Sequence, residues 1–187
     1  MNAKNDRRSQ RTRQAIGDAL VELMTEKGYD AISIKDIIER ANVGRSTFYS
    51  HYVDKDDLFV SQMDRVMDML SHHPQERGNP FFPSLGLFQH IQEQWKFFKS
   101  HAWGTGFDVL TKRLQKSLSE KIEGRLLASG QTFEVPVSVI ANFLAGSFLS
   151  MLRWWMDNKM LYTPEQMDEM FRKLALPGID SISSMEK

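Results

Sequence analysis

Five polar side chains between positions 45 and 51 have the chemistry needed to contact nucleic acid. Arg45 carries a planar guanidinium that can donate two parallel hydrogen bonds to O6 and N7 of guanine, which discriminates against other bases by about 1 to 3 kcal/mol. Thr47, Tyr49 and His51 supply hydroxyl and imidazole groups that suit phosphate oxygens, and such contacts set register without reading bases. Together with Ser46, these side chains form a candidate surface for binding DNA.

These side chains need a support, and residues 33–52 predict two short helices joined by a tight turn. Ser33 and Asp36 have the spacing of a capping box, which begins the first helix. Asn42 follows that helix, and Asn is the non-glycine residue that best tolerates the left-handed conformation ending a helix. The apolar residues between them recur at i, i+3, i+4 and i+7, the spacing of one buried stripe: Ile34, Ile37, Ile38 and Ala41.

The second short helix is predicted over residues 44–52. Phe48 and Tyr52 are one turn apart and face inward, so the polar side chains described above lie on the outer face. Val43 fills the turn between the two helices. Two helices connected in this way predict a helix-turn-helix, whose second helix enters the DNA major groove.

A run of specific residues extends this motif on both sides: Gly28, Tyr29, Ser33, Val43, Thr47, Phe48, Tyr49, Tyr52, Lys55 and Leu58. At this spacing, residues 9–60 resemble the DNA-binding domain of the TetR family of bacterial transcriptional regulators. Three positions depart from the family's usual residues, with Asn42 in place of Gly, Gly44 in place of Ser and Tyr52 in place of Phe. The resemblance implies that the DNA-binding residues are Ser33, Lys35, Gly44, Arg45, Ser46, Thr47, Tyr49, His51 and Lys55.

Several of these residues also have an ordinary structural interpretation. Tyr49 can be an aromatic side chain of the core, His51 an exposed helical residue without a contact, and Lys35 a solvated charge on the first short helix. Ser33 and Lys55 suit phosphate oxygens. Lys55 lies in the first turn of the next helix, where its ammonium and the free N–H groups can share one phosphate oxygen.

Charge is balanced overall but unevenly distributed. The 187 residues carry 24 basic and 24 acidic side chains, so the net charge gives no sign of a nucleic-acid partner. Residues 4–13 nevertheless hold five basic side chains, Lys4, Arg7, Arg8, Arg11 and Arg13, and one acidic side chain. Such a run is a solvated tail or, beside a helix-turn-helix, a contact to phosphate or to the minor groove.

The sequence gives no indication of an enzyme, a metal site or a cofactor. It contains no cysteine, which removes disulfides, thiolate ligands and cysteine nucleophiles, and it has no nucleophile elbow or phosphate-binding glycine loop. His72 and His73 are adjacent, so on a helix they point apart and do not form a metal pair. Residues 135–152 lack charge but include four polar side chains, and we expect a cytoplasmic protein that does not enter the membrane.

The whole chain predicts an all-α fold with two domains. A helix over residues 9–27 completes a three-helix DNA-binding domain, residues 1–54. Gly17 inside that helix is unfavourable by about 1 kcal/mol relative to Ala, and close packing is the one explanation that the sequence offers for it. Residues 55–187 form a larger domain for effector binding and dimerisation, with the helix at 55–72 as connector. Its other helices are expected at 85–100, 107–129, 136–158 and 164–174, with a loop at 74–84 from which Phe81 and Phe82 dock into the domain, and a disordered tail from Asp180.

The second domain is rich in large apolar side chains. In helices such residues usually form the core, but there are enough of them to line an apolar cavity as well. The resemblance implies that this domain holds a small, apolar effector of unknown identity. The candidate pocket residues are Phe88, Trp95, Phe98, Trp103, Phe107, Met151, Trp154 and Trp155.

The helix at 136–158 is apolar on nearly all sides, so it is expected to be buried on more than one face. Packing within its own domain accounts for one face, and a symmetry-related copy for the other. With the helix at 164–174, whose inward residues are expected to be Met167, Met170, Phe171 and Leu174, it is predicted to form a four-helix bundle across a two-fold axis. The resemblance implies the same homodimer.

These observations lead to one expected function and one alternative. The expected function is a homodimeric, sequence-specific regulator that binds a palindromic double-stranded operator and acts as a repressor, released when the effector binds. The alternative is a TetR-like co-activator that works through a protein partner.

Overall fold

The computed structural model describes residues 3–71, 82–93 and 107–184, and the described residues are almost entirely helical. The predicted all-α fold is confirmed. Residues 3–63 and 107–110 belong to one compact unit, and residues 64–71, 82–93 and 111–184 belong to a second, so that the division falls within two helices, after Met63 and after Leu110. The predicted domain boundary at residue 54 remains a prediction.

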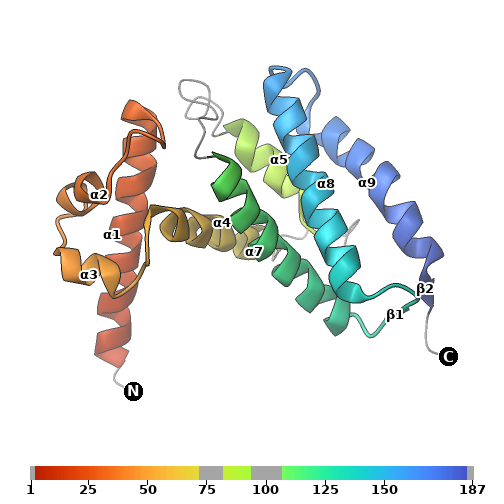
Figure 1. The fold of residues 1–187 in the computed structure, drawn as a ribbon, viewed down its shortest axis with the longest axis horizontal. Coiled ribbons are helices and arrows are strands. Elements are labelled where there is room, and N and C mark those ends of the chain that lie inside the picture. The colour runs from red at the N-terminus through yellow and green to blue at the C-terminus, as the bar shows by residue number, and fades with distance from the viewer. Residues whose placement is uncertain (1–2, 72–81, 94–106, 185–187) are drawn as a thin grey trace. The chain divides into compact units, whose positions relative to one another are not determined.

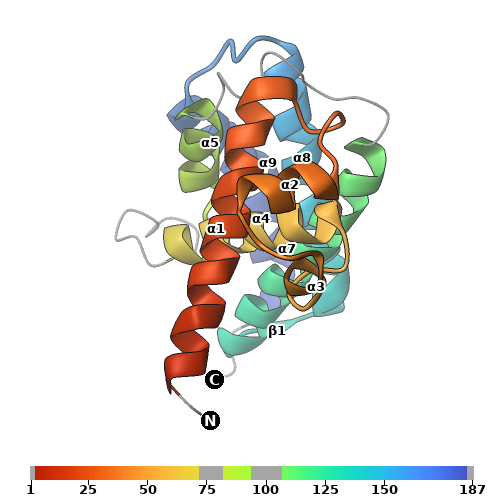
Figure 2. The ribbon, with the colours of Figure 1, turned by 90° about the vertical axis from the view of Figure 1, so that its left-hand side faces the viewer.

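The N-terminal unit is built on one long helix. Figure 2 shows two short helices, α2 and α3, lying against α1, with α4 following them in the chain. The structure starts α1 at Ala3, several residues before the predicted start. The bounds are α1 Ala3–Lys27, α2 Ile34–Arg40, α3 Arg45–Tyr49 and α4 Lys55–Ser71.

Apolar side chains from all four helices form the core of this unit. The buried residues of α1 recur at helical spacing, and they meet buried residues from α2, α3 and α4. Gly17 of α1 lies against Gln62 of α4, since a Cβ at Gly17 would lie 2.6 Å from the Gln62 side-chain oxygen. The expected close packing at this glycine is therefore confirmed. The fully buried side chains are Ile16, Leu20, Ile37, Phe48 and Leu58.

The second unit is a set of helices around an aromatic core. In Figure 1, α8 and α9 run side by side, and α9 also packs against α5. Phe82 contacts Phe148, with ring centroids 4.6 Å apart, and is fully buried as predicted, while Phe81 lies outside the described residues. The bounds are α5 Ser84–Glu93, α7 Phe107–Ala128, α8 Val137–Asp157 and α9 Pro164–Ser181.

The end of the chain differs from its prediction. α9 does not stop at Leu174 but continues through Pro177 to Ser181. After it, β2, Ser183–Ser184, pairs antiparallel with β1, Thr132–Phe133, which precedes α8. The tail predicted to be disordered from Asp180 is thus ordered through Ser184, because its backbone bonds the α7–α8 connection. Leu174 is also 77% exposed in the single chain, so its predicted inward direction is wrong.

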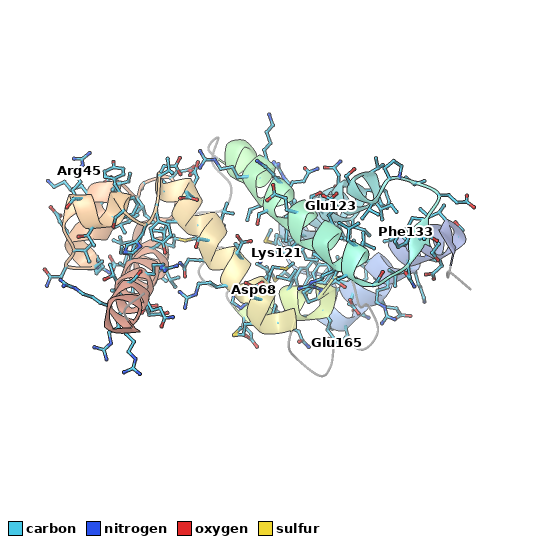
Figure 3. The ribbon with its side chains drawn as sticks, turned by 90° about the horizontal axis from the view of Figure 1, so that it is seen from below. Arg45, Asp68, Lys121, Glu123, Phe133 and Glu165 are labelled. Carbon is cyan, nitrogen blue, oxygen red and sulfur yellow. The ribbon has the colours of Figure 1, made fainter. Side chains whose placement is uncertain are left out.

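Two features of the second unit bear on function. Polar contacts join its part of α4 to α7: Lys121 Nζ lies 2.7 Å from the Asp68 carboxylate (Figure 3), and Ser117 donates to Asp64.

α8 is long and apolar enough to cross a membrane by length and composition alone. That is weak evidence for a span, because core helices of soluble proteins meet the same criteria and α8 packs on α9.

Candidate nucleic-acid interface

The position of α2 is fixed by the predicted capping box. The Ser33 hydroxyl accepts from the Asp36 N–H at 3.2 Å, and the Asp36 carboxylate accepts from the Ser33 N–H at 2.8 Å. Lys27 Nζ lies 2.8 Å from the same carboxylate. The ammonium of Lys27, together with the hydrogen bonds from Ser33, holds the pKa of Asp36 well below its ordinary value. The sequence prediction of this cap is confirmed.

The turn between α2 and α3 has the predicted left-handed residue. Asn42 has φ of 51°, and the Val43 N–H then donates to the Ile38 carbonyl at 3.0 Å, which satisfies one of the free carbonyls at the end of α2. Asn is among the few non-glycine residues that adopt this conformation at low cost. The chain can therefore turn within the four residues 41–44 and begin α3.

α3 is held from below by two aromatic rings. Phe48 is fully buried and Tyr52 is 4% exposed, with ring centroids 5.8 Å apart. Gly44 is the N-cap residue, with an extended backbone and no side-chain hydrogen bond to the helix. A Cβ there would make only ordinary contacts, the nearest with Thr47 Oγ1 at 3.6 Å. Packing thus does not require glycine at position 44.

The outer face of α3 carries the predicted polar set. Arg45 and Ser46 are exposed, Thr47 and His51 are partly exposed, and Tyr49 is 46% exposed, which excludes the core interpretation of Tyr49. Figure 3 shows Arg45 at the surface of the N-terminal unit. Its guanidinium carbon lies 5.8 Å from the centre of the Tyr49 ring. A cation beside an aromatic face in this range is attracted to it, which restricts the orientations of the arginine.

Lys55 has a structural role that the sequence did not indicate. Its ammonium donates to the backbone carbonyls of Tyr29 and Ile32 at 2.8 and 2.9 Å, and it lies 4.2 Å from the centre of the Tyr29 ring. Tyr29 also donates to the carboxylate of Asp56. Burial lowers the pKa of Lys55 from its ordinary value. Lys55 therefore ties the start of α4 to the α1–α2 connection, and its contact with phosphate remains a prediction.

Two other predicted DNA contacts already have partners within the chain. The Ser33 hydroxyl both accepts from Asp36 and donates to its carboxylate at 2.6 Å. Lys35 lies 3.8 Å from Glu39, and both side chains are largely exposed. Exposed pairs of this kind are weak, so Lys35 remains able to turn toward a phosphate. Ser33 and Lys35 both lie at the start of α2, in the same unit as α3.

The predicted effector residues separate into three groups. Phe88 and Trp155 are fully buried in the aromatic core, with ring centroids 5.4 Å apart. Trp154, the neighbour of Trp155 in the chain, is 48% exposed and stacks on Tyr162. Met151 is partly exposed. The others lie outside the described residues or, for Phe107, have no described side chain: Trp95, Phe98, Trp103 and Phe107.

Comparison with known proteins assigns both parts of the chain. The model of bacterial regulatory proteins of the tetR family matches residues 16–61, and that of a transcriptional regulator C-terminal region matches residues 80–176. The HTH-type transcriptional regulator YxbF of Bacillus subtilis, itself uncharacterized, is 41% identical over 69 residues, 36% of this chain and 18% of that protein. AcrR of Shigella flexneri is 37% identical over 59 residues, 32% of this chain and 27% of that protein. The matches thus span less than a third of either relative.

Solved structures match nearly the whole chain. A TetR transcriptional regulator from Streptococcus agalactiae is 27% identical, with a TM-score of 0.56 over 93% of this chain and 99% of that one. The dihydroxyacetone kinase operon activator DhaS has a TM-score of 0.58 over 92% of this chain and 98% of that one, but at 17% identity it shows the shared fold alone. With both family models matched, over the helix-turn-helix and over more than half of the chain, this protein belongs to the TetR family of bacterial transcriptional regulators.

Proposed function

We propose that the chain is a cytoplasmic repressor that binds a palindromic operator as a homodimer and releases it when a small apolar molecule binds the C-terminal unit. The observation that carries this proposal is the outer face of α3. Arg45 and Tyr49 are exposed there, while Phe48 anchors the helix from inside. A short rigid helix with one fork-shaped donor suits a guanine edge in the major groove.

Exposed apolar side chains support the dimer. Val139, Phe143 and Trp154 are about half exposed and recur along one side of α8, and Leu174 of α9 is more exposed still. Large apolar side chains on neighbouring helices mark a surface that another chain covers. A two-fold axis beside α8 and α9 would bury all four side chains against their symmetry-related copies.

The aromatic core supports an apolar effector. Phe88 contacts both Phe148 and Trp155 within the second unit, and an apolar molecule inserted beside them would be held by dispersion and burial. Binding of such a molecule would act on α4 through the contacts of Asp64 and Asp68 with α7, since a shift of α7 would move these two carboxylates of the connector helix. A coupling free energy of about 1 to 3 kcal/mol is enough to change operator affinity substantially.

Selection from a random duplex library tests this function. The purified chain should enrich a palindrome whose half-sites lie about one helical turn apart or somewhat more. Arg45→Ala should lose the preference at one base pair of each half-site, by about 1 to 3 kcal/mol, while Ser46→Ala keeps it. Equal weakening on every sequence for Arg45→Ala would contradict base reading by this residue. Binding only after addition of a second protein would favour the co-activator alternative.

A further inference from the structure

The first third of α1 is a basic helical arm, defined here by residues 7–13. The structure continues α1 to Ala3, so these residues are helical, and none of them is buried. Among the described side chains of α1, the first buried one is Ile16, nine residues beyond Arg7, which at the rise of an α-helix corresponds to about 13 Å. Figures 1 and 2 both show this end of α1 extending past α2 and α3.

The arginines of the arm have no charged partner among the described side chains. The arm contains Arg7, Arg8, Arg11 and Arg13 and no acidic residue. Within the part of the chain whose side chains are described, Arg13 alone of these arginines makes a side-chain hydrogen bond, to Ser9 at 3.2 Å. The C-terminal half of α1 is different, because Glu22 and Glu26 pair there with Arg40 of α2. Positive charge is therefore concentrated at one end of the helix, and negative charge is neutralised at the other.

Helix stability does not account for this arrangement. Arg7 and Arg11 are four residues apart and Arg8 and Arg11 three apart, and like charges at these spacings destabilise a helix. Packing does not account for it either, because all three side chains are exposed. What the arrangement does fit is a row of phosphates, which a rigid row of guanidiniums can neutralise without first leaving an internal partner.

We propose that Arg7, Arg8 and Arg11 bind the phosphate backbone of the duplex beside the half-site contacted by α3. This inference rests on the proposed DNA-binding function and extends it from the α3 surface to a second contact made by the same unit. The arm adds affinity without reading bases, because guanidinium contacts to phosphate carry no sequence information.

The test compares an arm variant with a matched control. The arm variant carries Arg7→Gln, Arg8→Gln and Arg11→Gln; Gln and Arg have similar helix propensities, so α1 should keep its helicity by circular dichroism. The control carries Lys112→Gln, Lys116→Gln and Lys173→Gln, which removes the same charge from exposed positions of the second unit. Operator affinity is measured against salt concentration for a duplex trimmed at the half-sites and for one extended by ten base pairs on each side.

The wild type and the control should bind the extended duplex more tightly than the trimmed one, and the arm variant should bind both equally. The slope of log affinity against log salt should be shallower for the arm variant by about 0.9 for each phosphate that its arginines no longer neutralise, up to about five for the six arginines of a dimer. A salt slope equal to that of the control, with operator selectivity intact, would overturn the arm proposal alone. If the wild type selects no duplex, the proposed function itself fails.

Discussion

Arg45 differs from the other predicted DNA-binding residues because it is exposed and lies beside an aromatic ring, while Ser33 and Lys55 already have hydrogen-bond partners in the chain. A guanidinium restricted by Tyr49 loses less rotamer freedom when it meets a base edge. Ser33 instead caps α2, and Lys55 ties the start of α4 to the α1–α2 connection, so both stabilise the unit that carries Arg45. In the proposed function, Arg45 reads bases, while Ser33 and Lys55 support the fold.

Replacing Lys55 should reveal its supporting role. Lys55→Ala leaves the carbonyls of Tyr29 and Ile32 without their donor, and partly buried groups left in this way cost about 1 to 3 kcal/mol. Urea unfolding should show this loss. Lys35→Ala is the matched control, since an exposed pair contributes about 0.3 to 0.5 kcal/mol. An unfolding free energy that is the same in both variants would contradict the structural role of Lys55.

Asp36 should make the N-terminal unit sensitive to acid. Because Lys27 and Ser33 lower its pKa below 3.8 in the folded chain, the carboxylate stabilises the fold above about pH 4 and that stabilisation is lost as the pH falls toward the folded pKa. Between pH 4 and 2, the unfolding free energy of Asp36→Asn should therefore fall less steeply than that of the wild type. High salt should reduce the difference between the two slopes, since salt screens the partly exposed pair of Lys27 and Asp36. Identical slopes at low salt would count against the pairing.

Among the contacts between helices, Gly17 of α1 lies against the side chain of Gln62 of α4. The amide of Gln62 occupies the space in which a Cβ would lie, so glycine is kept inside a helix despite its low helix propensity. This contact brings the connector helix against the long helix of the DNA-binding unit.

A double-mutant cycle measures this contact. Gly17→Ala in a Gln62→Ala background should stabilise the chain by about 1 kcal/mol, because only helix propensity changes. In the wild-type background the same change should gain less or lose stability, because the new methyl group displaces Gln62. Urea unfolding of the four proteins gives the coupling free energy, and additive effects would show that the two residues do not restrict each other.

Helix starts and ends were predictable from sequence where local side chains determine them. The Ser33 cap and the left-handed Asn42 depend on residues within a few positions, so their patterns were sufficient. The start of α1 was placed too late because basic residues form helix without any apolar periodicity. The end of α9 was placed too early because Pro177, which removes one backbone donor, normally stops a helix, whereas here the helix continues to the buried Ile179.

Tertiary partners account for what the sequence could not supply. The bonds of Lys55 join residues more than 20 positions apart, and the pairing of Thr132 with Ser184 joins the chain end to the α7–α8 connection. Leu174 was expected to face inward because it fits the apolar spacing of its helix. Its exposure in the single chain shows that spacing alone does not identify which apolar side chains of a helix the chain's own core covers.

For the whole molecule, the second apolar face predicts dimerisation. Phe143→Glu with Leu174→Glu should make the protein monomeric without unfolding it, because both side chains are exposed in the single chain. Sedimentation velocity at micromolar concentration checks this. Leu127→Glu, at another exposed apolar position, should leave the dimer intact. A monomeric wild type, or an unchanged dimer in the double variant, would be incompatible with the proposed interface.

The most direct measurement is the affinity and stoichiometry of the wild type on its selected palindrome, on one half-site and on a scrambled duplex at a fixed, moderate salt concentration. The account predicts two chains per palindrome, bound at least about a thousandfold more tightly than the scrambled duplex, with a large loss of affinity on the single half-site. Equal affinity for all three duplexes, or no binding to any of them at low ionic strength, would contradict it.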